Sequence, residues 1–86
     1  MSSYRVALAA SAEKELNRLT PKLIARVVKR IQALASNPRP PGCKTLVGGD
    51  REWRVRVGDW RMVYEIDDKA KIVDVTRIAH RREVYE

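Results

Sequence analysis

Residues 53–66 read WRVRVGDWRMVYEI and alternate with period two on both sides of the Gly-Asp pair. This pattern is typical of a β-hairpin with a two-residue turn. Gly58 supplies, without steric cost, the positive φ that the first central position of a primed turn requires. The predicted register places three pairs of residues opposite each other: Val57 and Trp60, Arg56 and Arg61, and Arg54 and Val63.

The two faces of this hairpin differ in charge. One face carries apolar and aromatic side chains: Trp53, Val55, Val57, Trp60, Met62 and Tyr64. The other carries Arg54, Arg56 and Arg61. Because like charges directly opposite each other destabilise a sheet, these arginines need anions. One alternative is that carboxylates of the same chain pair with the arginines: Glu52, Glu65 or Asp74. The other is an external anion.

Two helices are expected before the hairpin. Ser11 is the predicted N-cap of the first, which ends near Thr20-Pro21. Thr20 caps the second, and Pro21 suits its first turn. The second helix ends before Asn37-Pro38 and carries an apolar stripe at spacings of three and four residues. The stripe consists of Ile24, Val27, Val28, Ile31, Leu34 and Ala35.

A strand is expected at each end of this arrangement, over residues 4–8 and 71–78. Val73 and Val75 of the last strand match the apolar face, and Thr76 is expected beside Arg61. The predicted fold is α+β, with two N-terminal helices packed on one face of a small antiparallel sheet. That sheet is the N-terminal strand plus a three-strand meander, and residues 1–86 form one domain.

Composition narrows the classes of function. The chain has 86 residues and a net charge of +7, which favours a polyanionic partner. Cys43 has no second cysteine to pair with, and with the single His80 it cannot complete a zinc site. We therefore expect no metal and no cofactor. The sequence contains no apolar run of membrane-spanning length, so a soluble, cytoplasmic protein is expected.

Three motifs in this order resemble the RelE/ParE toxin superfamily. They are Lys44-x-Leu46-x-Gly48, the hairpin over residues 53–64, and the segment HRREVY over residues 80–85. The resemblance covers essentially the whole chain. It implies a RelE-like sheet with two helices and a cognate RelB-like antitoxin that wraps and neutralises the toxin. For the RelE branch it implies cleavage of mRNA in the ribosomal A site, and for the ParE branch inhibition of DNA gyrase.

The resemblance also implies functional residues. In ribonuclease members, the active side chains are basic residues of the central hairpin, an arginine after the last strand and a tyrosine in the tail. Carried over by position, they are Arg54, Arg56, Arg61, Arg81 and Tyr85.

The residues suggest how metal-independent cleavage could proceed. Arginine stays protonated, so it binds phosphate and transfers protons poorly. Several nearby arginines would lower the pKa of a tyrosine from its usual value near 10. We therefore expect Tyr85 to act on the 2′-hydroxyl while Arg61 and Arg81 stabilise the transition state. RNA binding is assigned to Lys44, Arg54, Arg56 and His80, and His80 is the alternative group for proton transfer.

Three readings of the function remain. The first is a ribosome-dependent mRNA endoribonuclease, with the ribosome, its rRNA and the A-site mRNA as partners. The second is a gyrase-inhibiting toxin without nuclease activity, and the third is an inactive antitoxin-binding relative. The hairpin aromatics are expected in the core rather than in a base-stacking platform. Arg26, Lys29 and Arg30 are either a solvated helix face or contacts to rRNA or an acidic antitoxin.

Overall fold

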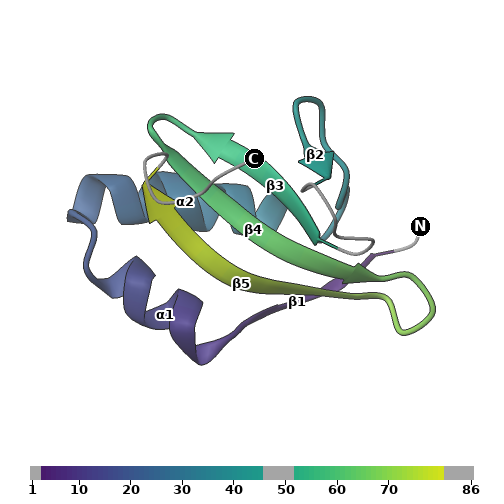
Figure 1. Cartoon of the computed structure of the whole chain (residues 1–86). Coiled ribbons are helices and arrows are strands. Elements are labelled where there is room, and N and C mark those ends of the chain that lie inside the picture. The colour runs from purple at the N-terminus through teal and green to yellow at the C-terminus, as the bar shows by residue number, and fades with distance from the viewer. Residues whose placement is uncertain (1–2, 46–51, 81–86) are drawn as a thin grey trace.

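The computed structural model describes residues 3–45 and 52–80. Within them the chain forms two helices and five strands (Figure 1). In chain order these are β1 (Arg5–Leu8), α1 (Ala10–Asn17), α2 (Pro21–Ala33), β2 (Lys44–Thr45), β3 (Glu52–Val57), β4 (Trp60–Asp67) and β5 (Ile72–His80). In that part of the chain, neither helix is long and apolar enough to cross a membrane.

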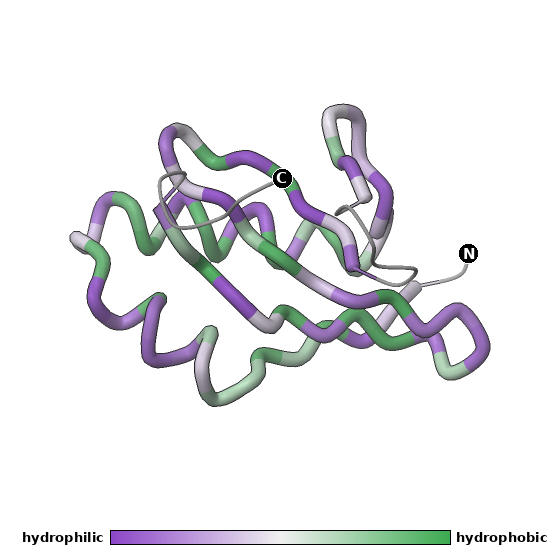
Figure 2. Tube along the Cα trace, viewed as in Figure 1, coloured by the Kyte–Doolittle hydropathy of each residue, from purple (hydrophilic) through white to green (hydrophobic). Residues whose placement is uncertain are grey.

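The predicted hairpin is confirmed as β3 and β4. Its register pairs Arg56 with Arg61 and Arg54 with Val63. Gly58 has a φ of +61°, so the turn uses the conformation for which glycine was expected. The hydropathy colour alternates along β3 in Figure 2, as a strand with two different faces requires.

The sheet has the strand order β1-β5-β4-β3-β2, and the two helices cover one of its faces (Figure 1). The predicted α+β class is confirmed, but the sheet is mixed rather than wholly antiparallel. Strand β1 pairs with β5 in parallel, Arg5 opposite Ile72 and Leu8 opposite Val75. Period-two alternation carries no information on strand direction. The connection from β1 to β5 also contains both helices, and is long enough for a parallel pair.

Of the two predicted helix N-caps, the one of α2 is confirmed and the one of α1 is wrong. The Thr20 hydroxyl accepts a hydrogen bond from the Leu23 backbone N–H at 3.3 Å, with Pro21 in the first turn of α2. Helix α1 instead begins at Ala10, with Ala9 as its N-cap. The Ser11 hydroxyl is not a cap because it donates to the Thr76 carbonyl of β5 at 2.8 Å.

The core lies between the helices and the apolar face of the sheet. Tyr64 is fully buried there, and Trp53 and Trp60 are partly buried against the core. The aromatic residues of the hairpin are therefore core residues, as predicted. The helices contribute Ala12, Leu16, Val27 and Ile31, and residues just after them contribute Leu19 and Leu34. The strands contribute Val55, Val57, Met62, Tyr64, Ile66, Val73, Val75 and Ile78.

Candidate nucleic-acid interface

Two like-charged pairs lie side by side on the face of the sheet that the helices do not cover. Lys44 of β2 is opposite Arg54 of β3, and Arg56 of β3 is opposite Arg61 of β4. These four side chains and Gly42 line a pocket of about 330 Å³, here called the hairpin pocket. The structure thus brings together four of the residues to which the sequence assigned RNA contact or catalysis. Among the described residues that line this pocket, every charged side chain is a cation.

The four cations differ in exposure. Lys44 and Arg56 are exposed, whereas Arg54 and Arg61 are each only 8% exposed. Two of the three hairpin arginines are therefore buried, although the helices do not cover their face of the sheet. Arg54 and Arg61 lie on inner strands of the sheet with neighbours on both sides, and the Nη1 atom of each is enclosed by the protein.

An acidic row crosses the same face further along the hairpin. Glu52 is opposite Glu65, and Glu65 is opposite Asp74. The ion pairs formed within the described part of the chain join Arg39 to Asp68 and Arg77 to Glu15. Neither of these two ion pairs uses a carboxylate of the acidic row.

An irregularity in β5 changes the neighbour of Arg61. The β4–β5 register shifts between Val63 and Tyr64, and Arg61 then lies opposite Ala79 rather than beside Thr76 as predicted. The Thr76 hydroxyl donates to the Val63 carbonyl at 3.3 Å. A bulge reverses the alternation of side chains, which the period-two pattern of the strand cannot show.

A second basic pocket lies at the tip of the hairpin, against helix α2. It is lined by Arg26, Lys29, Arg30, Arg56, Val57 and Gly58, has a volume of about 250 Å³, and is here called the α2 pocket. Arg56 lines both pockets. Arg30 Nη2 donates to the Arg56 carbonyl at 3.4 Å. The sequence showed three helix cations at spacings of three and one but gave no sign that they share a pocket with the hairpin.

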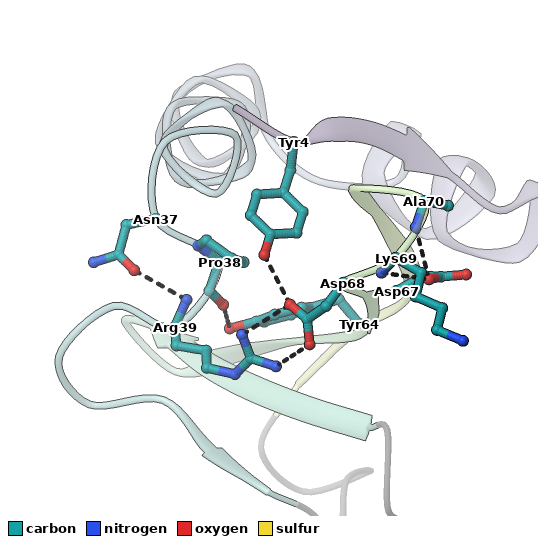
Figure 3. A network of polar contacts seen from close by, with 9 residues as sticks. All are labelled: Tyr4, Asn37, Pro38, Arg39, Tyr64, Asp67, Asp68, Lys69 and Ala70. Atoms are coloured by element: carbon teal, nitrogen blue, oxygen red, sulfur yellow. Dashed lines mark hydrogen bonds and ion pairs between the residues drawn. The ribbon is translucent and has the colours of Figure 1, made fainter. Parts of the chain in front are cut away.

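The segment between α2 and β2, which leads to the hairpin pocket, is fixed to the sheet by a polar network (Figure 3). Arg39 binds both carboxylate oxygens of Asp68, at 3.3 and 3.0 Å, and the Tyr4 hydroxyl donates to Asp68 Oδ1 at 2.7 Å. The buried Tyr64 hydroxyl donates to the Pro38 carbonyl at 2.8 Å. Sequence analysis missed this network because its members are far apart in the chain.

The network shifts the pKa values of its members. The hydrogen bond from Arg39, followed by that from Tyr4, lowers the pKa of Asp68. The hydrogen bond to Asp68 raises the pKa of Arg39. Burial raises the pKa of Tyr64, so this tyrosine stays protonated and serves as a hydrogen-bond donor rather than as a base.

Three of the site residues predicted from the sequence remain: His80, Arg81 and Tyr85. His80 lies opposite Trp60, and the two rings meet edge to face with centroids 5.4 Å apart. Strand alternation puts this pair on the other face from Arg61. Arg81 and Tyr85 lie outside the described residues. Within the described ranges, no group of three or more His, Cys, Asp or Glu side chains could hold a metal ion.

Comparison with known proteins gives the family. Residues 6–85 match the family described as "ParE toxin of type II toxin-antitoxin system, parDE". The chain is 35% identical over 83 residues to Toxin RelE of Mycobacterium tuberculosis, which covers 95% of this chain and 86% of that protein. It is 30% identical over 86 residues to Toxin RelG of the same organism, which covers 95% of each.

The fold agrees with solved toxin structures. The archaeal RelE-RelB complex from Pyrococcus horikoshii OT3 superposes with a TM-score of 0.83 and 25% identity, covering 98% of this chain and 100% of that chain. This chain shares its small α+β fold with that structure. The cationic hairpin pocket is described for this chain. The chain belongs to the RelE/ParE superfamily, the toxins of type II toxin–antitoxin systems.

Proposed function

We propose that this toxin is a metal-independent endoribonuclease that cleaves mRNA in the A site of the ribosome and so inhibits translation. The observation that supports the proposal is the pair of like-charged rows, Lys44 with Arg54 and Arg56 with Arg61, in one pocket. Such rows destabilise the sheet by themselves, and a bound phosphate backbone would offset their repulsion. The RelE and RelG names of the similar Mycobacterium tuberculosis proteins agree with this branch of the superfamily.

In this proposal, the described cations hold the substrate. Lys44, Arg54 and Arg56 bind phosphates of the RNA, and Arg61 stabilises the charge that develops on the reacting phosphate. Because guanidinium groups stay protonated, the proton of the 2′-hydroxyl must go elsewhere. We assign its acceptance to Tyr85, with Arg81 as a second cation at the phosphate.

The reaction is a transphosphorylation without added water. The 2′-oxygen forms a bond to the adjacent phosphorus as its proton leaves to the base, and the bond from phosphorus to the 5′-oxygen breaks. The 5′-oxygen takes up a proton. The products are a 2′,3′-cyclic phosphate and a 5′-hydroxyl.

The limited set of proton-transfer groups explains why a ribosome would be needed. No His or carboxylate lines the described part of the hairpin pocket. Holding the mRNA in reactive geometry contributes up to roughly 7–11 kcal/mol in favourable intramolecular reactions. The ribosome would supply this orientation, and free RNA would be cleaved poorly.

A RelB-like antitoxin is the proposed protein partner. The Pyrococcus horikoshii structure is a RelE-RelB complex. The similar structure from Mycobacterium tuberculosis is the toxin-antitoxin complex RelBE2, with a TM-score of 0.79 and 29% identity. The net charge of +7 favours a partner that is acidic where it meets the toxin.

Mapping of mRNA ends in a translating extract tests the proposed activity. We expect new 5′ ends with the parent protein, none with Arg61→Ala, and undiminished cleavage with the control Lys14→Ala, an exposed residue of α1. Tyr85→Phe should lower cleavage at least about tenfold and leave RNA binding intact, since a positioned proton acceptor typically contributes about 100- to 10,000-fold. Intact mRNA with the parent protein would contradict the proposal.

Gyrase inhibition is the second candidate, and the ParE description of the matching family favours it. In that case the cations would contact a protein–DNA complex. Unchanged mRNA ends together with induced DNA-damage signalling in the same cells would select this candidate over the nuclease.

A further inference from the structure

The charges on the uncovered face are separated along the hairpin, which restricts where a polyanion can run. The acidic row of Glu52, Glu65 and Asp74 crosses three strands on one side of Arg54. Arg56 lies on the other side of Arg54 along β3. A phosphate backbone bound in the hairpin pocket is repelled by the acidic row and attracted in the opposite direction. Among the described residues, these charges therefore favour a path of the RNA past Arg56.

That exit leads to the α2 pocket. Arg56 is exposed and lines both pockets, so no neutral surface separates them. Strand β2 pairs with β3 only at Trp53 and Arg54, so among the described residues the part of β3 that carries Arg56 has no strand beyond it. A single-stranded RNA can thus pass around this edge of β3 without meeting another β-strand of the described residues.

The α2 pocket has the chemistry of a phosphate site. Arg26, Lys29 and Arg30 are all exposed. The Arg30 guanidinium is held against the Arg56 carbonyl at 3.4 Å. The Arg26 guanidinium lies against the turn, with Nη2 at 3.6 Å from where a Cβ of Gly58 would be. Guanidinium groups held in this way are pre-oriented for phosphate oxygens.

We propose that the α2 pocket binds a phosphodiester of the same single-stranded RNA that occupies the hairpin pocket, with the strand crossing the edge of β3 at Arg56. This inference rests on the proposed function insofar as RNA is the substrate. Arg56 is then the pivot of the path, and Arg26 and Lys29 hold a phosphate outside the cleavage site. The acidic row repels the RNA backbone and so directs it toward Arg56.

Binding of uncleavable 2′-O-methyl RNA tests the path. The double variant Arg26→Ala/Lys29→Ala is compared with Lys14→Ala/Lys22→Ala, which removes the same charge from exposed positions of α1 and α2 outside both pockets. On the proposed path, a decanucleotide reaches both pockets, whereas a trinucleotide occupies the hairpin pocket alone.

We expect the first double variant to lose at least about tenfold in affinity for the decanucleotide relative to the control. Its slope of log affinity against log salt should fall by about 0.7, the value for one phosphate of a single strand that is no longer neutralised. Trinucleotide binding should be equal in the two variants. Equal decanucleotide affinity and equal slopes would overturn the proposal.

A ribosome-binding measurement separates the two sources of phosphate. The first double variant could bind both oligonucleotides like the control but associate weakly with vacant ribosomes. That result would overturn the proposal that one RNA strand occupies both pockets, and the phosphate at the α2 pocket would belong to ribosomal RNA. If decanucleotide binding fell and ribosome binding did not, the shared strand would be supported.

Failure of this inference and failure of the nuclease proposal give different results, because binding is measured without cleavage. A parent protein that cleaves translating mRNA while the two double variants bind alike would remove the α2 pocket and keep the nuclease. If the parent protein left mRNA intact while the Arg26 and Lys29 variant lost decanucleotide affinity, the nuclease proposal would be overturned and RNA binding at the α2 pocket would be supported.

Discussion

Arg56 on β3 and Arg61 on β4 lie directly opposite each other, and both line the hairpin pocket. Their register position is the one in which side chains of neighbouring strands come closest to one another, so their charges repel across the sheet. Stability and anion binding therefore oppose each other at this pair. A substitution that removes one charge should affect the two properties in opposite directions.

Arg56→Gln should raise the free energy of unfolding by about 0.2–1 kcal/mol, since it relieves a like-charge pair at an exposed position. The same change should weaken RNA binding. Urea denaturation and oligonucleotide titration measure the two effects. Arg5→Gln is the matched control because Arg5, an exposed strand arginine, faces Ile72. A loss of stability in Arg56→Gln would contradict the interpretation.

Glu65→Gln should also stabilise the fold. Glu65 lies between Glu52 and Asp74, so the substitution relieves two repulsive contacts at once. Thermal unfolding should show a gain of roughly 0.4–2 kcal/mol, taking about 0.2–1 kcal/mol for each contact. Glu13→Gln, at an exposed helix position without a carboxylate opposite, should show no such gain.

Tyr64→Phe should destabilise the protein by about 1–3 kcal/mol, because the buried Pro38 carbonyl would lose its hydrogen-bond donor. The removed hydroxyl also fastens the segment that precedes Lys44. Equilibrium denaturation gives the loss. Tyr4→Phe removes an exposed hydrogen bond to Asp68 and should cost less, so equal losses would argue against a special role for the buried bond.

Asp68 should make stability depend on pH in the acid range. Its pKa is lowered in the folded protein from 3.8, chiefly by the hydrogen bond from Arg39. The contribution of the ionised carboxylate is therefore complete above the unfolded pKa and is lost as the pH falls through the folded pKa. The difference in free energy of unfolding between the parent and Asp68→Asn should be constant above about pH 5 and shrink below 3.8. Denaturation at a series of pH values measures it, and a difference that grows on acidification would refute this account.

The hairpin and its register were predictable from the sequence because alternation and the Gly58 turn are local signals. The second helix was predictable for the same reason, through the Thr20 cap and a continuous apolar stripe. The pairing of Lys44 with Arg54, which completes the hairpin pocket, was not predictable. It depends on the two-residue strand β2, which no local sequence pattern indicates.

Features that depend on contacts between distant segments could not be predicted. Ser11 has the chemistry of a cap, but its hydroxyl binds a carbonyl of β5 instead. His80 was grouped with the cations because of its proximity in sequence, whereas its strand position places it on the face of Trp60. Burial of Arg54 and Arg61 depends on what surrounds the inner strands, and alternation reports only the face.

The parallel pair of β1 and β5 has a consequence for biosynthesis. Arg5 and Ile72, which lie opposite each other, are separated by almost the whole described chain. While a ribosome is still making the last strand, the first has no partner and this edge of the sheet stays incomplete. The pairing of β1 with β5 therefore cannot form before residues 72–75 have been synthesised, and contacts between segments so far apart in the chain slow folding.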